Sequence, residues 1–256
     1  MRSSFCSIAY RKIPGVAMPA IMAEVRAAGY DGIEVWWPHV EGLAPAQLAE
    51  LRAAADEAGL AMPMLSPYLG NFDLGMTNRA EMLARTRAAA TVAAVLGIPL
   101  LRAFVGWTCE CSSLTASEDY WHYILDGFRE MATIAADHGL TIAMETHELT
   151  LVDSVAGVLR MITEGDPRLR VNFQIDDLAA NSALPDGLAV YAALRPWIVH
   201  MHVQLDAPGS PRATETRRIL DAMHKDGFTG FTSIENCAGA GAPAAALSAG
   251  LDIFAR

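Results

Sequence analysis

Short apolar runs alternate along the chain with longer stretches of helix-forming residues. The apolar runs predict strands at residues 5–9, 33–36, 61–66, 100–104, 141–145, 170–174, 198–202 and 231–235. The clearest helices between them are predicted at residues 44–58, 78–96, 117–138 and 214–226. Eight strands alternating with eight helices in 256 residues predict the α/β class and a single (β/α)₈ TIM barrel that spans residues 1–256.

A repeated junction supports this interpretation. Five times, helix-forming residues are followed by a glycine, an apolar residue and a strand-like stretch, as in "DHGLTIAME" at residues 137–145. These glycines suit the left-handed position just past a helix end: Gly29, Gly59, Gly97, Gly139 and Gly227. The competing fold, an open doubly wound sheet, would bring a glycine-rich first turn, and "AYRKIPG" is not one.

Polar side chains stand where the predicted strands end, at the edge that carries the active site in such barrels. In chain order these ends carry Glu34, Ser66, Arg102, Glu145, Gln174, His202 and Glu235. Side chains alternate along a strand, so Glu145 shares a face with His147, and His202 shares one with His200. If those faces point inward, carboxylates and an imidazole converge in a mouth that holds few basic residues, which is unfavourable without compensation.

One divalent cation would offset this surplus of negative charge. Mixed oxygen and nitrogen donors suit Mn²⁺, Mg²⁺, Co²⁺ or Zn²⁺. The pattern therefore predicts one such ion, with Glu145 as a ligand and His147 within reach of whatever the metal holds. Two interpretations stay open for Glu34: a purely structural role, and a role in which it contacts a metal ligand without binding the metal itself. His200 is expected to be a satisfied core histidine.

The motifs "GYDGIEVW", "LLRAFVG", "METH", "HMHVQ" and "TSIEN" occur in this order along the chain. With them the sequence resembles the xylose isomerase-like TIM-barrel superfamily. That superfamily contains sugar isomerases, ketose 3-epimerases, hydroxypyruvate isomerase, inosose dehydratase and 3-dehydroshikimate dehydratase. The stretches "FCSIAYR", "EVWWPH", "LSPYL" and "LRPWIVHMH" look closest to the bacterial 3-dehydroshikimate dehydratases.

The resemblance implies a ligand set and a substrate pocket. In the relatives, three matched residues bind the metal together with an aspartate on the sixth strand: Glu145, His202 and Glu235. Four matched positions line the substrate pocket of the relatives: His39, Tyr68, Arg102 and His147.

The sixth strand departs from the superfamily's pattern of apolar residues followed by Asp-x-x-His. Aligned from "DPRLRVNF", the chain has Gln174 at the ligand position and Asp177 in place of the histidine, which implies a substrate contact for Asp177. A shift of two residues would instead make Asp176 the ligand. We expect Gln174 to face the metal, because loops absorb insertions far more readily than buried strands do.

The chemistry implied by the resemblance is proton removal beside a metal-held carbonyl, which gives an enediolate. The predicted function is a divalent-metal-dependent isomerase or epimerase of a small sugar-like polyhydroxy carbonyl compound. Glu145 and Glu235 are the expected base and acid, His147 is the next candidate, and Arg102 could hold a substrate carboxylate or hydroxyl. Two alternatives stay open: a metal-dependent dehydratase of the 3-dehydroshikimate or inosose type, and a non-catalytic sugar-binding barrel.

Charge and composition limit the partners. The formal net charge is −10, and such a surface repels phosphate backbones, so a small-molecule substrate is expected rather than nucleic acid. No apolar run is long enough for a membrane span and the start does not resemble a signal peptide, so a cytoplasmic location is predicted. The glycine-rich "NCAGAGAP" after the last strand could bind phosphate, although a flexible loop explains it equally well. A homo-oligomer is compatible with the sequence.

Overall fold

The predicted strands are present and follow one another around a closed parallel barrel in chain order. The computed structural model describes residues 1–107, 111–175, 178–235 and 243–254. Its strands are β1 (Arg2–Cys6), β2 (Gly32–Trp36), β3 (Met64–Leu69), β4 (Leu100–Ala103), β5 (Thr141–Glu145), β6 (Arg170–Phe173), β7 (Ile198–Val203) and β8 (Phe231–Ile234). The prediction of an α/β TIM barrel is confirmed.

Helices separate the strands along the chain. They are α1 (Met18–Ala28), α2 (Pro45–Ala58), α3 (Arg79–Leu96), α4 (Glu118–Asp137), α5 (Val155–Arg160), α6 (Leu178–Asn181), α7 (Gly187–Leu194), α8 (Pro211–Lys225) and α9 (Pro243–Phe254). Short 3₁₀ turns occupy Ser7–Tyr10 (η1) and Trp37–His39 (η2), and α5 continues into a wider turn, η4 (Met161–Gly165). Within the described ranges, no helix is both long and apolar enough to cross a bilayer.

The chain divides into two compact units. The first unit comprises residues 1–66, 95–98 and 200–256, and the second comprises residues 67–94 and 99–199. The assignment of residues 1–256 to one domain therefore stays a prediction.

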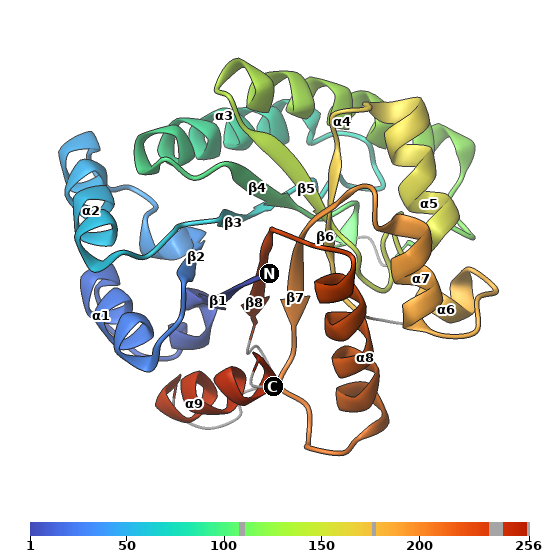
Figure 1. Ribbon diagram of the computed structural model, residues 1–256. Helices are drawn as coiled ribbons and strands as arrows, with labels where there is room; N and C mark the ends of the chain where they lie inside the picture. Colours follow the sequence, from blue (N-terminus) through green and yellow to red (C-terminus); the bar gives the residue numbers. More distant parts are fainter. Residues whose placement is uncertain (108–110, 176–177, 236–242, 255–256) are drawn as a thin grey trace. The chain divides into compact units, whose positions relative to one another are not determined.

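In the first unit the strands pair in parallel in the order β7–β8–β1–β2–β3. The helix α1 packs against both α2 and α9 (Figure 1). The sequence explains the limits of α2. Pro45 suits the first turn because that turn needs no N–H donor, and the Gln47 side chain accepts a hydrogen bond from the N–H of Ala44 (2.9 Å). The helix stops at Gly59, where φ is 65°.

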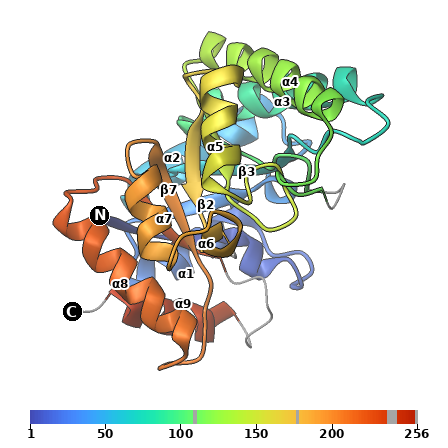
Figure 2. The same cartoon turned by 90° about the vertical axis from the view of Figure 1, so that its right-hand side faces the viewer.

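In the second unit β4, β5 and β6 pair in parallel. The helices α3 and α4 lie side by side (Figure 1, Figure 2), and Arg79 of α3 forms ion pairs with Asp126 and Glu130 of α4. The Ser117 hydroxyl caps α4 by accepting a hydrogen bond from the N–H of Tyr120 (3.3 Å). One face of α4 is apolar and buried, which fixes how this helix packs in its unit.

Two strands are displaced from their predicted positions. The strand β1 ends at Cys6 because the turn η1 follows, with the Ser7 hydroxyl accepting a hydrogen bond from the N–H of Trp36 (2.8 Å). The strand β3 begins only after Pro63, which has no N–H to donate to a ladder, so Ala61 makes just an isolated bridge. The other strands agree with the prediction to within one residue at each end, and the four clearest helices agree to within three.

The glycines of the repeated junction all have positive φ, between 65° and 103°, which confirms the prediction that they follow helix ends in the left-handed conformation. Gly139 is the example before β5. A Cβ atom added there would meet no heavy atom within 4 Å. Gly70, after β3, also has positive φ (76°), but a Cβ atom there would lie 1.9 Å from the carbonyl oxygen of Phe104. Gly70 is therefore required both by its conformation and by a close backbone approach.

These two glycines separate strain from steric overlap. Gly139→Ala should lower the free energy of unfolding by about 1 kcal/mol, the cost of a left-handed alanine. Gly70→Ala should cost about 4 kcal/mol or more, because the backbone around Phe104 must also move. Urea denaturation followed by circular dichroism measures both. Equal losses in the two variants would contradict the predicted overlap at Gly70.

Candidate functional site

Glu34, in the middle of β2, is a fully buried carboxylate of the first unit. Its Oε2 accepts hydrogen bonds from Nε2 of His202 (2.9 Å) and Nε2 of His200 (3.2 Å). Its Oε1 accepts from the Ser66 hydroxyl and from Sγ of Cys6 (3.4 Å). Burial alone would raise the pKa of Glu34, but the two imidazoles outweigh it and hold that pKa well below the usual range. Glu34 is thus held as an ion.

His200 is shared between two acceptors. Its Nε2 lies 2.9 Å from Oγ of Ser233 and 3.2 Å from Glu34, and the side chain is fully buried. The side chain is a core histidine, as expected, and its Nε2 has two hydrogen-bond partners.

His202 and Glu235 lie together at the carboxyl ends of β7 and β8. Nδ1 of His202 is 3.4 Å from Oε2 of Glu235, and both side chains are buried. The same oxygen of Glu235 accepts a hydrogen bond from Nε2 of Gln204 (2.9 Å). His202 therefore has a carboxylate at each ring nitrogen, Glu34 at Nε2 and Glu235 at Nδ1. The first unit brings together two of the predicted metal ligands.

His39, a predicted substrate residue, lies on the turn after β2. Its Nδ1 is 3.1 Å from Oγ of Ser7, and its ring meets Trp36 edge-on with centroids 5.2 Å apart. The imidazole lines a cavity of about 590 Å³ that is formed with the start of α1 and with α2. Burial lowers the pKa of His39, so the neutral ring is favoured.

In the second unit Arg102 and Glu145 form a buried ion pair. The guanidinium Nη1 lies 3.0 Å from Oε2 of Glu145, and each side chain is only 2% exposed. The guanidinium also lies 4.9 Å from the ring centroid of Phe104 and 5.9 Å from that of Tyr68. Part of the carboxylate surplus expected from the sequence is therefore offset by Arg102, which holds the predicted base.

Aromatic rings surround this pair. Phe104 stacks on Trp107 (centroids 4.8 Å apart) and on Tyr68 (6.4 Å), and His147 meets Phe104 and Trp107 edge-on. Nδ1 of His147 donates a hydrogen bond to the carbonyl oxygen of Glu148 (2.8 Å), because a carbonyl can only accept. In the neutral ring Nε2 then carries the lone pair. His147 is so arranged that it can accept a proton.

Gln174 follows β6 and is almost fully buried. Its backbone exchanges two hydrogen bonds with the Thr146 hydroxyl, which donates to the Gln174 carbonyl (2.9 Å) and accepts from the Gln174 N–H (2.8 Å). The two alternatives considered from the sequence, Asp176 as a ligand and Asp177 as a substrate contact, lie outside the described residues. So does most of the glycine-rich segment after β8.

Asn172 was not singled out from the sequence. It stands opposite Glu145 in the β5–β6 ladder and is fully buried. Neither polar atom of its amide has a hydrogen-bond partner among the residues that the structure describes. Buried amides are nearly always paired, so Asn172 is an unusual polar group beside Glu145 in the second unit.

Sequence reasoning also missed Cys6 as a donor to Glu34 and the ring of Trp107. The register explains the first case, because the β1–β2 ladder sets Cys6 opposite Glu34. The alternation of inward side chains along β1 would have identified Cys6 once the ladder was known. Trp107 is 37% exposed and follows β4, where an aromatic residue beyond a strand end was the only available signal.

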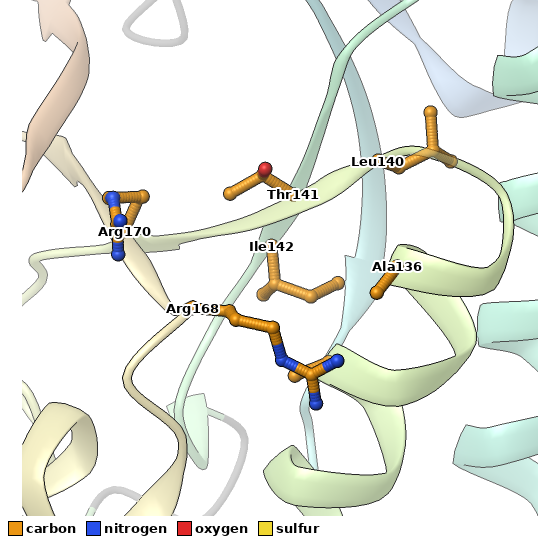
Figure 3. Close-up of a pocket in the computed structure, with 7 residues that line it drawn as sticks. Ala136, Leu140, Thr141, Ile142, Arg168 and Arg170 are labelled. Atoms are coloured by element: carbon orange, nitrogen blue, oxygen red, sulfur yellow. The ribbon is translucent and has the colours of Figure 1, made fainter.

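A separate small cavity of about 200 Å³ lies at the opposite, amino ends of β5 and β6 (Figure 3). Arg168 and Arg170 line it, but Arg168 is paired with Asp166 and Arg170 donates to backbone carbonyls. Residues at this end of barrel strands serve stability rather than catalysis. We assign no ligand to this cavity.

Comparisons with known proteins show which family and which relatives the chain resembles. A family model described as xylose isomerase-like TIM barrel matches residues 22–256. The 3-dehydroshikimate dehydratase of Bacillus anthracis is 26% identical over 208 residues, which cover 79% of this chain and 71% of that protein. A Streptomyces coelicolor protein named "Putative hydroxypyruvate isomerase" is 27% identical over 255 residues, covering 90% of this chain and 88% of that protein. The crystal structure of the probable 3-DHS dehydratase AsbF of B. anthracis has a TM-score of 0.83 at 20% identity, covering 99% of this chain and 98% of that one.

The Arg102–Glu145 pair predicts a large difference between two arginine substitutions. Arg102→Met should lower the free energy of unfolding by about 3–5 kcal/mol, because it leaves the buried carboxylate of Glu145 without its cation. The control is Arg85→Met, which removes an exposed partner of Glu81 at 3.9 Å and should leave stability nearly unchanged. Chemical denaturation of both variants checks this. A small loss for Arg102→Met would mean that Glu145 is compensated by other groups.

Proposed function

The chain belongs to the xylose isomerase-like TIM barrel family, and from this premise we propose that it is a divalent-metal-dependent isomerase or epimerase of a small polyhydroxy carbonyl compound. Relatives that match most of the chain are named as a dehydratase and an isomerase. Both kinds of reaction can begin with removal of a proton beside a carbonyl group, so the proposal is centred on that step.

The pair of His202 and Glu235 carries the proposal. A nitrogen and an oxygen donor lie 3.4 Å apart with both side chains buried, and two ligands of one ion stand at a similar separation, roughly 3 Å. The donor types fit Mn²⁺, Mg²⁺, Co²⁺ or Zn²⁺. We assign Glu145 and Gln174 as further ligands, since they stand at the carboxyl ends of β5 and β6, the end at which barrel enzymes hold their sites.

The strand registers favour Gln174 over Asp176. In the β7–β8 ladder His202 faces Ser233, so Glu235 lies two residues beyond the direct partner of His202. In the β5–β6 ladder Glu145 faces Asn172, and Gln174 likewise lies two residues beyond the direct partner of Glu145. The same offset in both pairs supports Gln174 as the ligand on the sixth strand.

A bound divalent ion would supply positive charge that stabilises the negative charge developing on the substrate's oxygens as the proton leaves. We propose that Glu145, oriented by Arg102, removes that proton and that Glu235 returns it elsewhere on the substrate. His147 is the second candidate base, because its Nδ1–H is committed to Glu148 and its Nε2 can accept. The rings of Tyr68 and Trp107, which stack on the buried ring of Phe104, offer an apolar surface to a substrate face.

A dehydratase of the 3-dehydroshikimate type is the second candidate. It is favoured by the B. anthracis relative and by the aromatic rings, which suit a flat cyclic substrate. The same proton removal would then be followed by loss of the β-hydroxyl group. A non-catalytic sugar-binding barrel stays as an alternative, and the assays below separate all three.

The purified protein is expected to hold one divalent ion per chain. Elemental analysis should detect it, and chelation should lower the melting temperature because a ligand that binds only the folded state stabilises it. Incubation with sugar-like carbonyl compounds in D₂O should then place deuterium on carbon. Appearance of an ultraviolet-absorbing aromatic product from 3-dehydroshikimate, without deuterium exchange into sugars, would favour the dehydratase. A metal-free protein that ignores chelators would exclude the proposal.

Glu145→Gln is the matched variant for the catalytic step. The amide can still offer an oxygen to the metal but cannot accept a proton, so turnover should fall by at least about 10²-fold while substrate binding changes much less. Unchanged turnover in this variant would show that Glu145 is not the base, and His147 would then be the next candidate. Substrate binding without turnover in the unsubstituted protein would indicate a sugar-binding barrel.

Gln174→Asp should tighten metal binding. An amide oxygen is a neutral ligand, and a carboxylate at the same position adds one negative charge to the site. Titration against a chelator of known affinity measures the change, with Asp176→Asn as the control that should leave affinity nearly unaltered. The reverse outcome, loss of the metal in Asp176→Asn and no effect of Gln174→Asp, would show that the register is shifted by two residues.

A further inference from the structure

Both ring nitrogens of His202 face a carboxylate. Nε2 lies 2.9 Å and 3.1 Å from the two oxygens of Glu34, and Nδ1 lies 3.4 Å from Glu235. The ring is fully buried, so its position and its protons are set by these neighbours rather than by water. The metal-binding nitrogen of a histidine is determined by what the other nitrogen donates to.

The contacts of Glu34 determine which nitrogen carries the proton. A hydroxyl, a thiol and two imidazole nitrogens point at its carboxyl group, and an ionised carboxylate can only accept hydrogen bonds. Glu34 forms no ion pair with a lysine or arginine in the part of the chain that the structure describes. Nε2 of His202 lies 3.1 Å and 2.9 Å from the two oxygens of this carboxylate, and a lone pair on Nε2 would be repelled by them, so Nε2 must carry a hydrogen.

We propose that Glu34 is a positioning residue: it holds His202 as the Nε2–H tautomer, so that the lone pair of Nδ1 is directed toward Glu235 and toward the metal. The inference rests on the proposed function only for the metal; the tautomer itself follows from the contacts of Glu34. It also resolves the two roles that the sequence left open for this residue.

The geometry at Nδ1 agrees with this role. A lone pair on Nδ1 and a carboxylate oxygen of Glu235 at 3.4 Å repel each other unless positive charge stands between them. A proton on Nδ1 or a divalent ion provides that charge, and the two compete for the same lone pair. Because Glu34 fixes one hydrogen at Nε2, the lone pair of Nδ1 stays available to either a second proton or a divalent ion.

His200 also contacts the carboxyl group of Glu34. Its Nε2 is divided between Ser233 (2.9 Å) and Glu34 (3.2 Å), so it satisfies Glu34 without displacing His202. Ligand atoms of Glu34, His200 and His202 lie within 4.8 Å of one another, and a second ion among them is the rival interpretation. That interpretation requires both imidazoles to lose the Nε2 hydrogens that their hydrogen bonds to Glu34 use.

Glu34→Gln tests the proposal, because it keeps the size of the side chain and removes the charge. Its amide group can place an N–H toward Nε2, which would move the imidazole hydrogen of His202 to Nδ1 and remove the ligand lone pair. Long-range ¹H–¹⁵N correlation spectra of histidine-labelled protein at mildly alkaline pH report the tautomer without any metal. Chelator competition, at a temperature where each variant is folded, reports metal affinity. Ser233→Ala is the matched control, since it removes a buried hydroxyl that contacts His200.

The expected result is Nε2–H at His202 in the unsubstituted protein, loss of that form in Glu34→Gln, and a metal dissociation constant raised about 10–100-fold, with little change in Ser233→Ala. The proposal is overturned if unsubstituted His202 carries its proton on Nδ1, a result that needs no variant. It is also overturned if Glu34→Gln lowers only the melting temperature, or if two ions bind per chain and the variant loses one. Absence of metal from every variant would remove the proposed function, and the tautomer spectra would still decide the role of Glu34.

Discussion

A carboxylate buried among parallel strands must find its hydrogen-bond donors on other strands, and this constraint shapes both units of the protein. In the first unit the Glu34 carboxylate accepts hydrogen bonds from imidazole, hydroxyl and thiol groups of β1, β3 and β7. In the second unit Glu145 forms an ion pair with the guanidinium of Arg102, which lies on the adjacent strand β4. The β1–β2 ladder sets Cys6 opposite Glu34, and the β4–β5 ladder sets Arg102 opposite Ala143, two residues before Glu145. The two histidines come from β7, which does not pair with β2. Strand pairing therefore determines part of the charge compensation in each unit, and the packing of side chains inside the sheet determines the rest.

The sequence predicted the order of strands and helices because each junction carries local signals. A glycine with positive φ ends the helix before β5, and an apolar run bounded by a polar end gives the limits of that strand without error. The errors have local causes as well. Pro63 interrupts a stretch that is otherwise strand-like. After β1, the Ser7 hydroxyl accepts a hydrogen bond from the N–H of Trp36, which is far away in the sequence. The strand propensity of the residues alone predicts neither the late start of β3 nor the early end of β1.

For the candidate site, residue types at strand ends were enough to propose His202, Glu235 and Glu145, since a barrel brings such positions to one end. Their roles stay predictions. Residue types were not enough to assign Glu34, whose hydrogen bonds to His200 and His202 cross more than 160 positions of sequence. Nor could they show that Arg102 is already committed to a carboxylate. Pairings between distant strands depend on register and side-chain direction, which one sequence does not determine.

Glu34 also couples two properties that are usually considered separately. Its donors come from β1, β3 and β7, so the side chain links strands across the sheet of the first unit while it orients one predicted metal ligand. Loss of the charge would then weaken the packing of the unit and alter the ligand together, because one set of hydrogen bonds serves both. A fall in activity could arise from either cause. Only an observable that belongs to the imidazole itself, the position of its proton, distinguishes orientation of the ligand from support of the fold.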